Sequence, residues 1–134
     1  PNDAESYSAR GTFLLFTGDP HQALEPFELA MRLNPNLGPD HCGDTGWAYY
    51  LSQRYEEAVA MFTKAARMDS NDSSIHAGLA ASYAQLGRKD DASRAAADVL
   101  RTWPFFRIDE FVGDFQGFEH QAAITAGLLK AGLR

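Results

Sequence analysis

The strongest constraint on the fold is a pattern of small and aromatic residues that recurs every 34 or 35 positions. Ala23, Ala58 and Ala92 are separated by 35 and 34 residues. Four further columns keep the same spacing: Leu14, Tyr49 and Tyr83; Phe27, Phe62 and Ala96; Ala30, Ala65 and Val99; Pro35, Ser70 and Pro104. Five columns in register are not expected by chance, so the pattern indicates three copies of one supersecondary unit.

Each copy contains two stretches in which apolar residues return every three or four positions, as they do in amphipathic helices. In the second copy, only Ser52-Gln53-Arg54 separates the two stretches. Because so short a connection requires antiparallel packing, we expect Gly46 and Ala58 to lie where the two backbones approach most closely. One such hairpin buries little apolar surface, so each copy needs a neighbour.

A helix-turn-helix unit of this length, with this order of small, aromatic, small and proline columns, resembles the tetratricopeptide repeat. The second copy carries the Gly, Tyr, Tyr, Ala, Phe and Ala columns of that family. The resemblance implies an all-α, right-handed superhelical solenoid. Its three repeats occupy about residues 4–37, 39–72 and 73–106, within a region spanning residues 1–106.

After Pro104 the periodicity changes. A cluster of aromatic and aliphatic residues precedes a final helix over residues 122–133, and comprises Phe105, Phe106, Ile108, Phe111, Phe115 and Phe118. Because a solenoid leaves an apolar surface at its end, we expect residues 107–134 to form capping helices of the same domain. The alternative is that the aromatic residues form a separate patch for docking a partner.

Charge and motifs argue against several classes of function. The formal net charge is -6, and Lys and Arg are scattered singly, unlike the basic face of a nucleic-acid-binding protein. No apolar run approaches the roughly 20 residues that cross a bilayer. The sequence has no glycine-rich phosphate loop and no nucleophile signature. We therefore expect no catalysis, no cofactor, and no nucleic-acid or membrane partner.

The isolated histidines and the single cysteine are expected to be structural. Cys42 lies four residues before Gly46, on the same helical face, which predicts a buried thiol rather than a metal ligand. His21, His76 and His120 are expected to face solvent or to cap helices. One cysteine cannot form an internal disulfide, which is compatible with a cytoplasmic location.

In the tetratricopeptide family, the first helix of each repeat lines a concave groove. The groove positions implied for this chain are Ser8, Thr12, Leu15 and Phe16; Gly43, Trp47, Tyr50 and Leu51; and Ala77, Ala81, Ala84 and Gln85. Large aromatic residues such as Trp47 and Tyr50 are typical anchors for a bound protein or peptide. The alternative is that the final helices fold back and bury both side chains as core.

None of these groove positions is Lys, Arg or Asn. Some members of the family use a clamp of those residues to hold an acidic peptide C-terminus. Without cationic or amide donors, a buried carboxylate would remain unsatisfied, so we do not expect a ligand of that kind.

A narrower resemblance concerns the C-terminal part of the chain. Its aromatic cluster and its ending, Gly127-Leu128-Leu129-Lys130-Ala131-Gly132-Leu133, are similar to the C-terminal repeat region of bacterial class III adenylate/guanylate cyclases. In that family the repeats are an accessory region that follows the catalytic domain. A start at Pro1, without an initiator Met, agrees with a piece of a longer protein.

The expected function is therefore a non-catalytic protein-interaction or regulatory module of a larger bacterial signalling protein, such as a nucleotide cyclase. The alternative is a structural module that forms a homodimer or acts as a spacer, with a groove filled by its own residues.

Overall fold

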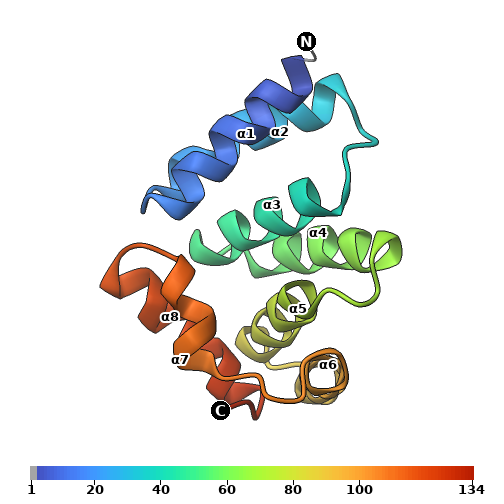
Figure 1. Ribbon diagram of the computed structural model, residues 1–134, viewed down its shortest axis with the longest axis vertical. Coiled ribbons are helices and arrows are strands. Elements are labelled where there is room, and N and C mark those ends of the chain that lie inside the picture. The colour runs from blue at the N-terminus through green and yellow to red at the C-terminus, as the bar shows by residue number, and fades with distance from the viewer. Residues whose placement is uncertain (1–2) are drawn as a thin grey trace.

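The computed structural model describes residues 3–134, so Pro1 and Asn2 lie outside the described residues. Within this range the chain forms eight α-helices, one short 3-10 helix and no strand, which confirms the predicted all-α fold. Three antiparallel pairs stack in chain order, and a C-terminal segment follows them (Figure 1). The pairs are α1 (Asp3–Phe16) with α2 (Pro20–Leu33), α3 (Pro39–Leu51) with α4 (Tyr55–Met68), and α5 (Ser73–Gln85) with α6 (Lys89–Thr102).

Glycines and phenylalanines of the repeat columns make the closest contacts within and between the pairs. Phe62 of α4 is fully buried, and its ring lies against Gly46 of α3 and Gly78 of α5. A Cβ atom built on Gly46 would come within 2.8 Å of that ring. In the first pair, Phe27 faces Gly11 in the same way. The absence of a side chain at these glycines therefore lets successive helices approach around one buried ring.

The turn inside each pair has the same backbone conformation in all three repeats. Gly18, Gln53 and Gly87, at 35- and 34-residue spacing, have φ angles of 97°, 62° and 75°. Gln53 thus adopts a left-handed conformation that glycine occupies at the two equivalent positions. In each turn, the backbone amide of the residue after this position donates to the carbonyl oxygen five residues earlier, as at many helix C-termini. The three hydrogen bonds run from Asp19 to Leu14, from Arg54 to Tyr49 and from Arg88 to Tyr83, at 2.8–3.0 Å.

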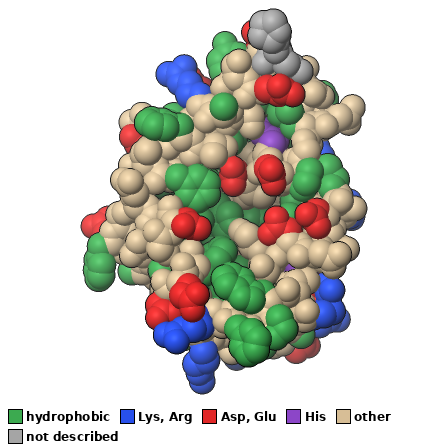
Figure 2. All heavy atoms as spheres, viewed as in Figure 1, with side chains coloured by type: hydrophobic (Ala, Val, Ile, Leu, Met, Phe, Trp, Pro, Cys, Tyr) green, Lys and Arg blue, Asp and Glu red, His purple; other side chains and the backbone are tan. Residues whose placement is uncertain are grey.

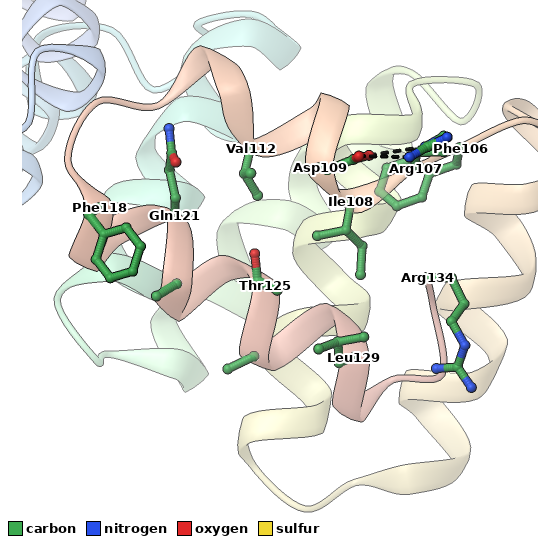
Figure 3. A pocket seen from close by; sticks show the side chains of 12 residues that line it. Phe106, Arg107, Ile108, Asp109, Val112, Phe118, Gln121, Thr125, Leu129 and Arg134 are labelled. Carbon is green, nitrogen blue, oxygen red and sulfur yellow. Dashed lines mark hydrogen bonds and ion pairs between the residues drawn. The ribbon is translucent and has the colours of Figure 1, made fainter.

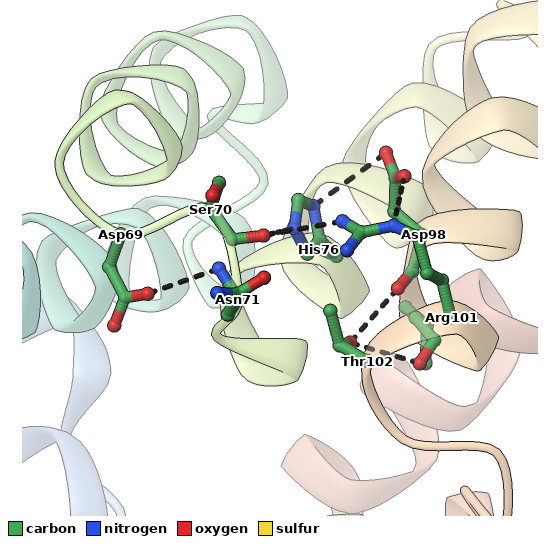
Figure 4. A network of polar contacts seen from close by, with 8 residues as sticks. Asp69, Ser70, Asn71, His76, Asp98, Arg101 and Thr102 are labelled. Atoms are coloured by element: carbon green, nitrogen blue, oxygen red, sulfur yellow. Dashed lines mark hydrogen bonds and ion pairs between the residues drawn. The ribbon is translucent and has the colours of Figure 1, made fainter.

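A polar network joins the connection between α4 and α5 to helix α6 (Figure 4). His76 Nε2 donates to the carbonyl oxygen of Ser70 at 2.7 Å, and Arg101 donates to the same oxygen at 3.3 Å. Arg101 also pairs with Asp98. The prediction that His76 faces solvent or caps a helix is wrong, because its side chain is only 6% exposed and binds this carbonyl. The predicted burial of Cys42 is confirmed.

The C-terminal segment consists of α7 (Ile108–Phe111), the 3-10 helix η1 (Val112–Asp114) and α8 (Phe118–Lys130). Helix α8 packs mainly against α5 and also contacts α3. The segment folds back along the side of the stack that α3 and α5 form (Figure 1). This placement matches the alternative in which the final helices fold back over Trp47 and Tyr50, which are both buried.

None of the described helices combines the length and the hydrophobicity that crossing a membrane requires.

Replacing Ala58 by leucine should lower the free energy of unfolding by roughly 1 to 3 kcal/mol, because Ala58 is 0% exposed and the larger side chain overpacks the α3–α4 contact. Urea denaturation followed by circular dichroism measures the change. Ala60 lies on the same helix but is exposed, so Ala60→Leu is the matched control, with an expected effect within about 0.5 kcal/mol. Wild-type stability of Ala58→Leu would contradict the packing described here.

Candidate functional site

The predicted groove residues come together on the side of the stack formed by α1, α3 and α5. Trp47 and Tyr50 lie at its centre, and each is only 1% exposed. Other predicted residues are also buried: Leu15, Gly43, Ala77 and Ala81. The remaining predicted residues are partly exposed, namely Ser8, Thr12, Phe16, Leu51, Ala84 and Gln85.

Aromatic side chains of the C-terminal segment cover Trp47. Its ring centroid lies 5.6 Å from that of Phe111 and 5.6 Å from that of Phe115. Phe115 also packs against Phe16 of α1, with ring centroids 5.0 Å apart. Phe115 therefore bridges α1 and α3, and Trp47 is not available to a separate molecule while this segment stays in place.

Tyr50 binds the backbone of α8. Its hydroxyl donates to the carbonyl oxygen of Ala123 at 2.7 Å and accepts a hydrogen bond from Gln85 Nε2 at 3.2 Å. The same Gln85 accepts a hydrogen bond from Lys130 through its Oε1 atom, at 2.9 Å. Burial raises the pKa of Tyr50 to about 12, so the hydroxyl stays protonated and remains a donor at neutral pH.

Gly127 allows α8 to approach this closely. A Cβ atom at this position would lie 2.9 Å from Cβ of Ala81 and closer still to the hydroxyl oxygen of Tyr50. Three residues, Tyr50, Ala81 and Gly127, thus fix the distance between α8 and the groove. Tyr50 and Ala81 are among the predicted groove positions, whereas the close contact of Gly127 with them was not predicted.

One part of the concave side remains uncovered, along α1 and α3, and reaches the C-terminal segment at one end. We call it the open strip. It consists of two depressions of about 510 and 250 Å³ that share Asp44. No Lys or Arg is among the described residues that line either depression. The lining combines a hydroxyl group, an aromatic ring and four aspartates: Thr12, Phe16, Asp40, Asp44, Asp72 and Asp114.

The charge distribution on the surface agrees with this composition. Figure 2 shows Asp and Glu side chains across the middle of one face, interspersed with hydrophobic ones, whereas Lys and Arg lie toward the edges. The sequence analysis identified Thr12 and Phe16 but missed the carboxylates. Asp44 could have been found, because it lies three residues before Trp47 and seven before Leu51, on the same helical face.

Asp44 is the most perturbed carboxylate of the strip. Thr12 Oγ1 donates to Asp44 Oδ2 at 2.8 Å. Burial raises the pKa of Asp44 to about 6, the Thr12 hydrogen bond opposes this shift, and the nearby charges of Asp40 and Asp72 add to it. The strip therefore holds a carboxylate whose ionised form lacks a compensating cation.

The histidine beside the strip is held in its neutral form. His41 is buried, and its Nδ1 lies 2.9 Å from the hydroxyl oxygen of Ser8. Burial, together with the charge of Lys64, lowers the pKa of His41 to about 4. His41 consequently carries no positive charge toward Asp40 and Asp44 at neutral pH. Among the described residues, no group of three or more His, Cys, Asp or Glu is arranged to hold a metal ion.

Comparisons with known proteins agree with the repeat pattern. Two family models, both described as tetratricopeptide repeat, match residues 4–37 and 49–102. The small glutamine-rich tetratricopeptide repeat-containing protein 2 of Mycosarcoma maydis is 30% identical over 106 residues. That match covers 74% of this chain but only 30% of the relative.

Solved structures show the same fold. Two crystal structures of MamA each match with a TM-score of 0.74 at 19% sequence identity. The matches cover 98% of this chain, and 77% and 72% of the two MamA chains. At this identity the likeness concerns the arrangement of the helices.

Gly127→Ala should destabilise the protein by a net of up to about 2 kcal/mol. Overpacking typically costs about 1 to 3 kcal/mol, of which the better helix propensity of alanine recovers up to about 1 kcal/mol. Denaturant unfolding measures the difference. Gly113→Ala is the matched control in the same segment, since a Cβ atom there meets nothing within 4 Å. A more stable Gly127→Ala variant would show that α8 does not contact Tyr50 and Ala81 as described.

Asp44→Asn should stabilise the protein at pH 7 by up to about 3 kcal/mol. Because folding raises the pKa of Asp44 from 3.8 to about 6, its favourable contribution is complete below about pH 4 and is lost as the pH rises through about 6. The advantage of the variant should therefore shrink as the pH falls from about 6 to about 4. Urea unfolding of both proteins at each pH measures the difference in their free energies of unfolding. The pKa of His41 is lowered on folding, but His41 is present in both proteins, so its contribution cancels in that difference. A difference independent of pH would contradict the burial of Asp44.

Proposed function

We propose that this chain, which contains tetratricopeptide repeats, is a non-catalytic protein-interaction module whose partner binds the open strip. Tetratricopeptide-repeat proteins bind proteins or peptides, which supports an interaction role. The proposal rests on the observation that the C-terminal segment covers only part of the concave side. The C-terminal segment covers Trp47 and Tyr50, but leaves the depressions beside Thr12 and Phe16 uncovered.

The chemistry of the strip favours a partner segment that carries Lys or Arg. Burial is the main cause of the raised pKa of Asp44, and repulsion from the nearby carboxylates of Asp40 and Asp72 adds to it. A cation placed among them relieves this repulsion and provides the missing counter-charge. The partly exposed ring of Phe16, packed against Phe115, offers an apolar contact beside the carboxylates. The partner segment would therefore combine a basic side chain with an apolar or aromatic one.

An acidic peptide is disfavoured at the same place. Its carboxylates would meet four aspartates of the strip, and no Lys or Arg of the described lining could bind them. This agrees with the sequence analysis, which found no cationic or amide clamp at the groove positions.

We further propose that the module belongs to a larger bacterial signalling protein in the cytoplasm, such as a nucleotide cyclase. The support is the similarity of the aromatic cluster and of residues 127–133 to the C-terminal repeat region of class III cyclases. The coding sequence immediately upstream of Pro1 tests this. A nucleotide cyclase domain is expected there, and any other domain, or none, would overturn the assignment.

Selection of peptides from a random library displayed on phage tests the partner chemistry. The selected peptides should be enriched in Lys or Arg next to apolar residues. A synthetic peptide of the selected sequence should bind about tenfold more weakly to Asp44→Asn and to Asp72→Asn, since loss of one charge contact of about 1.4 kcal/mol corresponds to that ratio. Fluorescence anisotropy measures the dissociation constants.

Asp90→Asn is the matched control, because Asp90 is an exposed carboxylate in the first turn of α6. Its affinity for the selected peptide should equal that of the wild type. Selection of acidic peptides, no enrichment over an immobilised control protein, or affinities unchanged in both strip variants would each overturn the proposal.

A further inference from the structure

We infer that the outer face of α8 pairs with the same face of a second copy of this chain, forming a two-fold symmetric dimer through an antiparallel α8–α8 contact. This inference does not depend on the open strip. It concerns the opposite side of α8, which points away from the groove.

Helix α8 has two apolar faces. Ile124, Gly127 and Leu128 are buried and face the stack. On the other side, the side chain of Phe118 is 84% exposed and that of Leu129 is 47% exposed. An apolar face of this kind on an otherwise packed helix indicates an interaction surface.

The exposed face forms one wall of a groove of about 1090 Å³. Ile108 and Val112, from α7 and η1, line the other wall, and Figure 3 shows them alongside α8. Besides Gln121, the α8 residues that line the groove follow one another at helical spacing: Phe118, Ala122, Thr125, Ala126 and Leu129. Large residues stand at the two ends and small residues in the middle. This shape fits another helix, because the small residues permit a close crossing while the large ones pack on either side.

The order of these residues makes the face complementary to itself. When two copies of α8 run antiparallel and cross near Ile124, Phe118 of one copy lies beside the partner's Leu129. In the same register, Ala122 lies beside the partner's Ala126. The midpoint of the first pair falls between residues 123 and 124 and that of the second at residue 124, so a single two-fold axis accommodates both contacts.

The charges that flank the face agree with this register. Glu119 and Lys130 are both exposed and lie on the same flank of α8, and their midpoint, between residues 124 and 125, lies within one residue of the other two midpoints. In the antiparallel pair, Glu119 therefore faces the partner's Lys130, and the symmetric contact repeats this pairing. In a parallel pair, Glu119 would face a second Glu119. Within the described residues, Glu119 makes no hydrogen bond or ion pair. Lys130 donates one hydrogen bond, to Gln85 Oε1 at 2.9 Å, and its ammonium group keeps two further donors for the partner's Glu119.

Sedimentation velocity over a range of protein concentrations tests the dimer. The wild type should pass from monomer to dimer as the concentration rises. Ala126→Arg places a charged side chain at the crossing point and should raise the dimer dissociation constant by at least about tenfold. Ala97→Arg is the matched control, since Ala97 is an exposed alanine on α6, and it should dimerise as the wild type does.

Charge reversal tests the antiparallel register itself. Glu119→Lys and Lys130→Glu should each weaken self-association, because each variant places like charges opposite one another. An equal mixture of the two variants should restore association, because one copy then carries two lysines and the other two glutamates at these positions. Circular dichroism confirms that each variant is folded.

Three results would overturn the inference: a wild type that stays monomeric at every concentration, self-association unaffected by Ala126→Arg, or a mixture that associates no better than its components. None of these outcomes bears on peptide binding at the open strip, so the two proposals fail separately.

Discussion

The contact between the aromatic residues of α3 and helix α8 is the interaction on which the rest of the structure depends. Trp47 and Tyr50 would present a large apolar surface on the concave side if nothing covered them. The C-terminal segment covers this surface in two parts. Phe111 and Phe115 pack against Trp47. Helix α8 covers Tyr50, because Gly127 permits a close approach and the carbonyl of Ala123 accepts the hydrogen bond of the Tyr50 hydroxyl. The hydrogen bond satisfies a buried polar group, and the glycine removes the steric obstacle.

This contact divides the molecule into three surfaces of different character. The centre of the concave side is filled by the chain itself, whereas the open strip keeps its carboxylates accessible beside Asp44. The outer face of α8 is apolar and carries Phe118. One helix therefore closes part of the groove with one face and presents a second apolar surface with the other, so its position determines what both surfaces offer to a partner.

Much of the fold could be predicted from the sequence, because the information is local and repeated. The spacing of Ala23, Ala58 and Ala92 indicated the helix pairs, and Gly46 marked a position at which the ring of Phe62 packs closely against α3. The placement of α8 could not be predicted in this way, because it depends on long-range contacts that no repeat period encodes. Asp44 was missed because it is not among the groove positions that the family implies, although it shares a helical face with Trp47. His76 was misjudged because its partner is a backbone carbonyl, which has no sequence signature.

The accessibility of Trp47 tests the central claim most directly. Trp103→Phe leaves Trp47 as the single tryptophan, so its fluorescence reports this site alone. If the C-terminal segment covers the groove in solution, the emission should be that of a buried indole, and acrylamide should quench it weakly. Strong quenching, approaching that of the urea-unfolded chain, would show that Trp47 is open to solvent and would contradict the covered groove.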